Sequence, residues 1–506
     1  MPLRRLLLLA AALLALAVPA TARADRNLEV AIADDAAVLN EPDQARAAQT
    51  VGQWAAMGLD TVRLFAEWQA IAPQNDKVSA PPGFNGANPA DPGYYWDKLD
   101  RAVNLVRGAG MNVMLTITGP GPLWASREPA LGNRRYKPRP DLFAQFARAV
   151  ALRYGRDVTR YVIWNEPNQP LWLQPQFTCT LARKCTPYSP SLYRSLVRAA
   201  IPAIRLADLR SQVIVGATSP RGQSPRSRNA VMRPLTFIRA LGCVDDRLKR
   251  TRKGPCRSFK PITGVDGFAY QPHSVLRSPD QPNPNPDEAS LADLPRLETL
   301  LDAIQRHGGL KKRGAGRLPL FFTEYGYQTN PPDPYAGVSE AKQSKWLQEA
   351  AYLSWKDPRV RSLTQYEWRD EPLGRGTKAT KYSGWQSGLM TAAGRPKLSY
   401  RTFPNPFWVD LPPGSHRARL WGQVRPGDAH LVTVQRRWPG RKAWVAVRTL
   451  TTDVRGYWTF TRTVTAPTEF RFLWQPRDAY GAPSGPPVTS DVRLVRPVKK
   501  PRVSSG

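Results

Sequence analysis

The stretch RYVIWNEPN, residues 160–168, decides the fold more than any other part of the chain. Its first half is a short, largely apolar run, and the polar group Asn-Glu-Pro follows at once. A strand that is apolar along its whole length is typical of a parallel sheet whose two faces are covered by helices. The polar group then falls at the carboxyl end of the strand, where parallel α/β folds place their functional residues.

Seven other runs resemble this one, and helical periodicity lies between them. The runs are LEVAIA (28–33), TVRLFAEW (61–68), NVMLTIT (112–118), QVIVGA (212–217), GVDGFAY (264–270), LPLFFTE (318–324) and RSLTQYEW (361–368). Apolar residues recur at three- and four-residue steps in 42–58, 95–110, 141–155, 191–208, 294–308 and 340–355, as in amphipathic helices. Eight strand–helix units over residues 25–404 predict an α/β fold, a (β/α)8 TIM barrel. The alternative, an open doubly wound sheet, usually carries a Gly-rich phosphate loop after its first strand, and residues 33–43 contain none.

The composition changes after Pro404. Short strand-like runs separated by turns predict a small β-sandwich accessory domain over residues 405–475. Residues 476–506 are basic and rich in Pro, Ser and Gly, so we expect a disordered tail there.

Residues 1–24 have the pattern of a signal peptide: two arginines, an apolar run and the Ala-Arg-Ala group at 22–24. The apolar run is shorter than the roughly 20 residues that span a bilayer. We therefore expect a secreted, extracellular protein with no membrane association once the leader is removed.

The chain contains four cysteines, Cys179, Cys185, Cys243 and Cys256. Export permits disulfides, and of the three possible pairings the local one, Cys179–Cys185 with Cys243–Cys256, is favoured because each pair lies in one short region. Their spacing does not match that of zinc sites, so we expect no metal.

The formal net charge is +33 over 506 residues. A charge of this size attracts nucleic acids or anionic surfaces. The basic residues are scattered and accompany no nucleic-acid motif, so we expect a solvated surface, weak contact with anionic cell-wall polymers, and no specific nucleic-acid partner.

The predicted strand ends bring one set of polar and aromatic residues to the mouth of the barrel. The candidates are Arg63, Trp124, Asn165, Glu166, Tyr270, His273, Glu324 and Trp368, with Tyr366 as the alternative to Trp368. Two carboxylates, Glu166 and Glu324, end the fourth and seventh strands. Hydrolysis of a glycosidic bond needs such a pair, one group as proton donor and the other as nucleophile. Arg63 is a candidate for keeping the nucleophile ionised.

These residues resemble the clan-A glycoside hydrolases, which are cellulase-like, and within that clan most closely families 5 and 39. The resemblance covers residues 25–404 and rests on Asn165-Glu166-Pro167 after the fourth strand and on Glu324 ending the seventh. It implies that Glu166 is the acid/base and Glu324 the nucleophile of a retaining O-glycosyl hydrolase. It further implies that Asn165 binds the sugar 2-hydroxyl and that the ring of Trp368 forms the floor of the sugar-binding site.

The resemblance implies a polysaccharide or oligosaccharide with β-glycosidic bonds as substrate, cleaved by double displacement without a cofactor. The sequence departs from the clan at two places: YQPHS (270–274) leaves the partner of the nucleophile open between Tyr270 and His273, and a Gly-Pro-Gly-Pro turn replaces a common His after the third strand. A catalytically inactive carbohydrate-binding or cell-surface barrel is the alternative function. Long loops at 79–95 and 277–289 are expected to contribute to substrate selection.

Overall fold

The structure is a computed structural model that describes residues 27–182, 184–478 and 481–497. The predicted leader, residues 1–24, and the last nine residues of the predicted tail lie outside these ranges.

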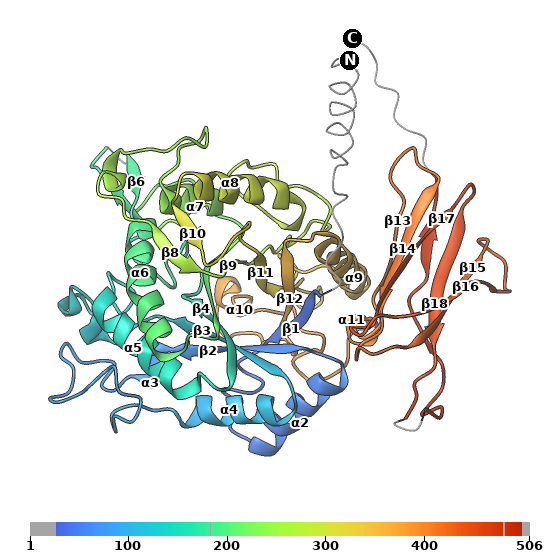
Figure 1. Ribbon diagram of the computed structural model, residues 1–506, viewed down its shortest axis with the longest axis horizontal. Coiled ribbons are helices and arrows are strands. Elements are labelled where there is room, and N and C mark those ends of the chain that lie inside the picture. The colour runs from blue at the N-terminus through green and yellow to red at the C-terminus, as the bar shows by residue number, and fades with distance from the viewer. Residues whose placement is uncertain (1–26, 183, 479–480, 498–506) are drawn as a thin grey trace, which may run out of the picture.

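Eight parallel strands form a closed barrel, as predicted, in the order β1-β12-β11-β9-β7-β4-β3-β2 (Figure 1). The strands are β1 (Glu29–Ala33), β2 (Thr61–Glu67), β3 (Asn112–Thr118), β4 (Val158–Ile163), β7 (Gln212–Thr218), β9 (Gly267–Tyr270), β11 (Leu320–Tyr325) and β12 (Val360–Tyr366). Almost every residue in them is buried, because side chains fill the barrel on one face and pack against helices on the other.

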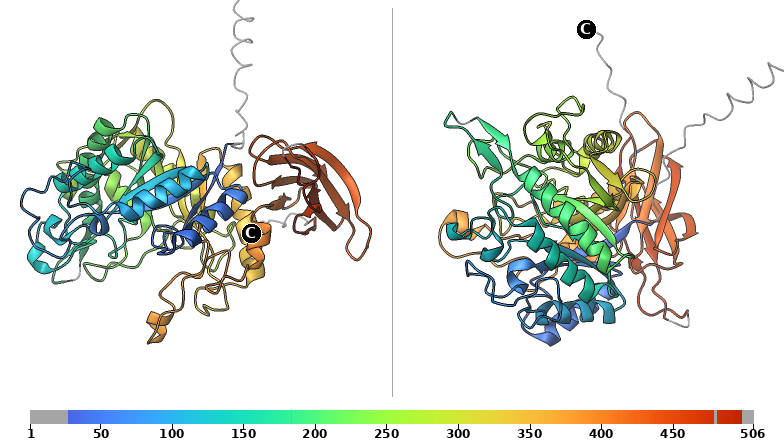
Figure 2. Two further views of the ribbon diagram at one scale, coloured as in Figure 1. Left: turned by 90° about the horizontal axis from the view of Figure 1, so that it is seen from below. Right: turned by 60° about the vertical axis from the view of Figure 1, so that its left-hand side comes forward.

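The six predicted helices surround this barrel, together with shorter ones that the sequence pattern did not reveal. The predicted ones are α2 (Gln44–Ala56), α4 (Asp97–Gly108), α5 (Pro140–Tyr154), α6 (Ser189–Ala207), α8 (Leu294–Arg306) and α9 (Glu340–Lys356). The others are α3 (Trp68–Ile71), α7 (Pro234–Gly242), α10 (Lys378–Lys381) and α11 (Leu398–Thr402). The segment that carries α10 extends outward from the barrel (Figure 2).

The predicted sixth strand, residues 264–270, is divided in two at Asp266. The first half, β8 (Ile262–Val265), leaves the barrel and pairs with β10 (Leu310–Lys312). The carboxylate of Asp266 accepts the backbone N–H of Val213 and pairs with Arg205 and Arg313. These bonds hold the chain where β9 enters the barrel.

The C-terminal region forms two antiparallel sheets. One is β13 (Phe407–Asp410), β14 (Arg417–Gln423) and β17 (Tyr457–Thr463); the other contains β15 (Leu431–Arg437), β16 (Val445–Thr451), β18 (Thr468–Trp474), β19 (Val488–Thr489) and β20 (Arg493–Val495). The prediction of a disordered tail from residue 476 is wrong for residues 488–495, because β19 and β20 add to the edge of β18. The stretch between β18 and β19, residues 475–487, is rich in Pro and Gly and shows no strand pattern in the sequence.

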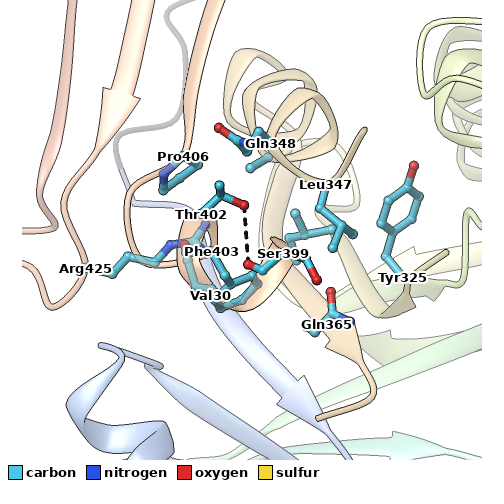
Figure 3. Close-up of a pocket in the computed structure, with 12 residues that line it drawn as sticks. Val30, Tyr325, Leu347, Gln348, Gln365, Ser399, Thr402, Phe403, Pro406 and Arg425 are labelled. Atoms are coloured by element: carbon cyan, nitrogen blue, oxygen red, sulfur yellow. Dashed lines mark hydrogen bonds between the residues drawn. The ribbon is translucent and has the colours of Figure 1, made fainter. Parts of the chain in front are cut away.

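The barrel and the sandwich lie beside each other (Figures 1 and 2). The sandwich has a core of its own and also contributes Trp421 and Tyr457 to the core of the barrel. Trp421 and Tyr457 of the sandwich pack against Tyr352 and Trp355 of α9, with ring centroids 5.7–6.3 Å apart. A small apolar cavity also lies at this boundary, between β1, α9 and the chain that enters the sandwich (Figure 3). Arg425 lines this cavity and donates to the carbonyl of Phe403.

Both disulfides follow the favoured local pairing, Cys179–Cys185 and Cys243–Cys256. The first joins β5 (Phe177–Cys179) to β6 (Cys185–Pro187). Within the ranges that the structure describes, no helix has the length and apolar character to cross a bilayer.

Candidate active site

Glu166 follows the end of β4 in an unusual backbone conformation. Both Trp164 and Glu166 have positive φ values, 69° and 38°, which non-glycine residues seldom adopt and which concentrate at functional sites. The N–H of Glu166 donates to the carbonyl of Ala217 at 2.9 Å and fixes this turn. Gly119, in the turn after β3, leaves room for the ring of Trp164, because a Cβ at this position would lie 2.4 Å from that ring.

Glu324 lies inside β11 and is bound by Arg63 of β2. The Arg63 Nη1 group donates to Glu324 Oε1 at 2.5 Å, and the Arg63 side chain is only 2% exposed. Arg63 also donates to Thr116 Oγ1 and to Asn165 Oδ1, both at 2.8 Å. A guanidinium held at three points keeps its positive charge fixed beside one carboxylate.

A second set of contacts orients the groups around this pair. Asn165 Oδ1 also accepts from Gln271 Nε2 at 2.9 Å, so its amide nitrogen is turned away from both donors. His273 Nε2 lies 3.8 Å from Glu324 Oε2. The His273 ring stacks with the rings of Tyr325 and Trp385, with centroid distances of 6.2 and 5.4 Å.

The two carboxyl groups have opposite protonation tendencies. Burial, together with the negative charge of Glu324, raises the pKa of Glu166 to about 8. Burial also acts to raise the pKa of Glu324, but the charge of Arg63 and the contact with His273 outweigh it and lower that pKa below its ordinary value. At neutral pH one group therefore holds a proton while the other is ionised.

Both carboxyl groups line an open cleft of about 640 Å³ at the mouth of the barrel. Of the predicted residues, Asn165, Glu166, His273 and Glu324 line it, and Arg63 lies directly behind Glu324. Five aromatic residues also line the cleft. Phe65 with Trp172 and Tyr366 with Trp385 form edge-to-face pairs, each 5.6 Å between centroids, and Tyr382 is the fifth.

Three predicted substrate-binding residues do not reach the cleft. Trp124 is buried and donates to the carbonyl of Pro73. Tyr270 is buried, and its hydroxyl donates to the carbonyl of Ala289. Trp368 is buried against Trp54 and Tyr400, because the chain turns away after β12 ends. The alternative residue, Tyr366, lies in the cleft in its place.

Sequence reasoning missed several residues of the cleft. Trp172 lies six residues after Glu166, and Trp385 lies in the segment GWQSG that follows α10. Residues 219–223 after β7 form another part of the wall. Of the two long loops expected to select substrate, 79–95 and 277–289, only Glu288 of the second lines the cleft. Among the described residues, no group of three or more His, Cys, Asp or Glu is placed to hold a metal ion.

The chain matches one protein family across most of the barrel. The family model for cellulase (glycosyl hydrolase family 5) matches residues 38–357. No curated protein matches at a significant level. Solved structures with a similar fold include a glucosidase from Croceicoccus marinus (12% identity, 82% of this chain and 89% of that chain, TM-score 0.44). Another is endo-glycoceramidase II from a Rhodococcus species (15% identity, 87% and 98% coverage, TM-score 0.41).

Proposed function

The chain belongs to glycosyl hydrolase family 5, and from this premise we propose that it is a secreted, retaining O-glycosyl hydrolase of β-linked glycans. In this proposal Glu166 is the acid/base and Glu324 the nucleophile. The opposite protonation of these two groups carries the proposal, since double displacement needs a proton donor and an ionised nucleophile in one cleft.

In the first step, a carboxylate oxygen of Glu324 attacks the anomeric carbon, and the bond from that carbon to the leaving oxygen breaks. The proton of Glu166 passes to the leaving oxygen, so the departing sugar is a neutral alcohol. Arg63 supports this step because it keeps Glu324 ionised inside a desolvated site. The product of the step is a glycosyl ester on Glu324.

In the second step, Glu166 has become a carboxylate and removes a proton from water. The water oxygen attacks the anomeric carbon, the ester bond breaks, and Glu324 leaves as a carboxylate. Two inversions restore the original anomeric configuration. Glu166 regains its proton, and neither step needs a metal or an organic cofactor.

The walls of the cleft support a carbohydrate substrate. The aromatic rings of Phe65, Trp172, Tyr366 and Trp385 offer apolar faces and edges to sugar rings, whose hydroxyl groups need polar partners. Asn165 supplies such a partner, because its oxygen already accepts two hydrogen bonds and its amide N–H groups remain for an acceptor.

Two disulfides support the proposed export, because disulfides persist in oxidising compartments. Secretion into the medium and removal of residues 1–24 can be checked by amino-terminal sequencing of the exported protein.

The catalytic roles can be tested with Glu166→Ala and Glu324→Ala and an aryl β-glycoside. We expect each variant to lose about 10²–10⁴-fold or more in turnover. Azide should restore turnover in both variants. In Glu166→Ala it replaces water in the second step and gives a β-glycosyl azide. In Glu324→Ala it replaces the missing nucleophile and gives an α-glycosyl azide. Glu67→Gln, at the end of β2 and outside the cleft, is the matched control and should remain active. Full activity in either alanine variant, or an inverted product from the wild type, would refute the assignment.

A further inference from the structure

The C-terminal sandwich presents one of its two sheets to the barrel and the other to solvent. The sheet of β13, β14 and β17 supplies Trp421 and Tyr457 to the barrel core. The sheet of β15, β16 and β18 lies on the far side of the sandwich from the barrel (Figure 1). Its outer face is therefore an exposed surface that the catalytic cleft does not use.

The alternation of side chains shows which residues this outer face carries. Phe470, Phe472 and Trp474 of β18 are buried inside the sandwich, so Arg471 points to the outer face. The register pairs Arg471 with Gln435 and Glu469 with Arg437 on β15. Partners that lie opposite each other share a face, so Arg437 and Arg471 occupy the same outer surface.

Trp444 lies against both of these arginines. The guanidinium carbons of Arg437 and Arg471 lie 4.4 and 4.2 Å from its ring centroid. Arg437 donates to Glu469, and Arg471 donates to Gln435 at 2.8 Å. Stacking and hydrogen bonding fix both guanidinium planes, and each retains further N–H donors for a ligand.

The hairpin formed by β15 and β16 extends this surface with more positive charge. Residues 431–451 contain five basic residues and no Asp or Glu. Arg436 and Arg448 lie opposite the buried Phe470 and Val434 and so share the inner side of the sheet, which leaves Arg437 and the turn residues Arg441 and Lys442 for the outer surface. At the turn, Trp438 is 52% exposed and lies under Arg436, with the guanidinium carbon 4.6 Å from the ring centroid. Arg441 and Lys442 are exposed beside it.

We propose that this surface, the β15–β16 hairpin with Arg471, binds an anionic polysaccharide that carries carboxylate or sulfate groups. Fixed arginine planes match such groups, which guanidinium binds in two-point fashion. The exposed ring of Trp438 offers an apolar platform for a sugar ring. A flat sheet face with a projecting hairpin suits a linear chain rather than a small molecule.

The choice of a glycan over a nucleic acid has two grounds. Two guanidinium groups already lie within 4.4 Å of the centroid of the Trp444 ring and take up stacking area that a base would need. The second ground rests on the proposed function, because the barrel of the same chain is proposed to act on glycans.

Binding can be measured by affinity electrophoresis with the full chain carrying Glu166→Gln, so that the polymer stays intact. Polygalacturonate is the anionic probe, a neutral glucomannan the comparison, and a thymidine oligonucleotide the nucleic-acid probe. We expect polygalacturonate to retard the protein, less so as salt is added. Arg441→Gln/Lys442→Gln should weaken this binding about three- to tenfold, and Trp444→Ala should weaken it as well. Thermal unfolding of each variant establishes that the fold is kept.

The matched control is Lys98→Gln/Lys260→Gln, which removes the same charge from exposed positions on the barrel and should leave binding unchanged. Equal weakening in this control would overturn the inference, since net charge alone would then explain retention. No retardation at low salt, or oligonucleotide binding as strong and as sensitive to the hairpin variants, would also overturn it. A wild-type protein that binds polygalacturonate but hydrolyses no β-linked glycan would instead count against the proposed function only.

Discussion

Replacement of Arg63 by methionine is the sharpest test of how the barrel keeps its nucleophile ionised. Met is similar in length to Arg but has no charge and no donor. The change removes the 2.5 Å bond to Glu324 and the bonds to Thr116 and Asn165. Glu324 then remains buried without its main positive partner, although His273 still lies 3.8 Å away.

The size of the effect follows from the geometry. Two opposite charges whose centres are about 4 Å apart attract each other by about 4 kcal/mol at an effective dielectric constant of about 20. Breaking a buried pair by removing one partner typically costs about 3–5 kcal/mol of stability. We therefore expect the free energy of unfolding to fall by about 3 kcal/mol near neutral pH in Arg63→Met.

The pKa of Glu324 determines how the stability loss in Arg63→Met varies with pH. In the wild type the pKa of Glu324 is lowered by folding, so its ionisation stabilises the fold above the ordinary carboxyl range. That contribution is lost as pH falls through the lowered pKa. In the variant, burial dominates and raises the pKa of Glu324, so its ionisation opposes folding at neutral pH. The stability deficit of Arg63→Met should therefore be largest at neutral pH and shrink in acid.

The assay combines calorimetry from pH 4 to 8 with the pH profile of kcat/KM on an aryl β-glycoside. The acidic limb of the profile should move to higher pH in Arg63→Met, because Glu324 must be ionised to attack. Arg160→Met is the matched control: Arg160 is also buried and pairs with Glu29, but at the opposite end of the barrel. It should lose stability without moving the acidic limb. An unmoved limb in Arg63→Met, or the same movement in both variants, would refute the reasoning.

Three further expectations follow from the site and the fold. Activity of the wild type should decline as pH rises through about 8, where Glu166 loses the proton it donates, and a pH profile of kcat/KM that stays level to pH 10 would contradict this. Tyr366→Ala should lower kcat/KM about tenfold or more, because a contact with the sugar is lost. Trp368→Phe should lower the melting temperature and leave KM unchanged. Kinetics and calorimetry on both variants distinguish the two roles. Cys243→Ser/Cys256→Ser, which opens a loop of sequence separation 13, should cost about 3 kcal/mol in denaturant unfolding, and an unchanged midpoint would argue against the bond.

The barrel could be predicted because its signal is local and repeated. Each strand is a continuous apolar run, and burial on both faces requires this pattern wherever the strand lies in the sequence. The same logic located Glu166 and Glu324, since the backbone alone carries the end of a strand to the mouth of the barrel.

Aromatic neighbours were harder to predict because they depend on side-chain direction beyond the strand ends. Tyr366 ends β12, whereas Trp368 comes after a turn that directs its ring into the core. Trp172 and Trp385 reach the cleft from loops whose course depends on tertiary contacts. Short strands such as β19 and β20 are stabilised by their pairing with β18, so their own composition does not reveal them.

The aromatic contact between α9 and the sandwich has a consequence for how this protein can be rearranged. Trp421, which is fully buried, and Tyr457 belong to the barrel's own core. A chain truncated at Pro404 would expose Tyr352 and Trp355 to water. A sandwich joined to a different barrel would expose Trp421 and Tyr457. The two parts should therefore melt in one calorimetric transition, and separating them should destabilise both.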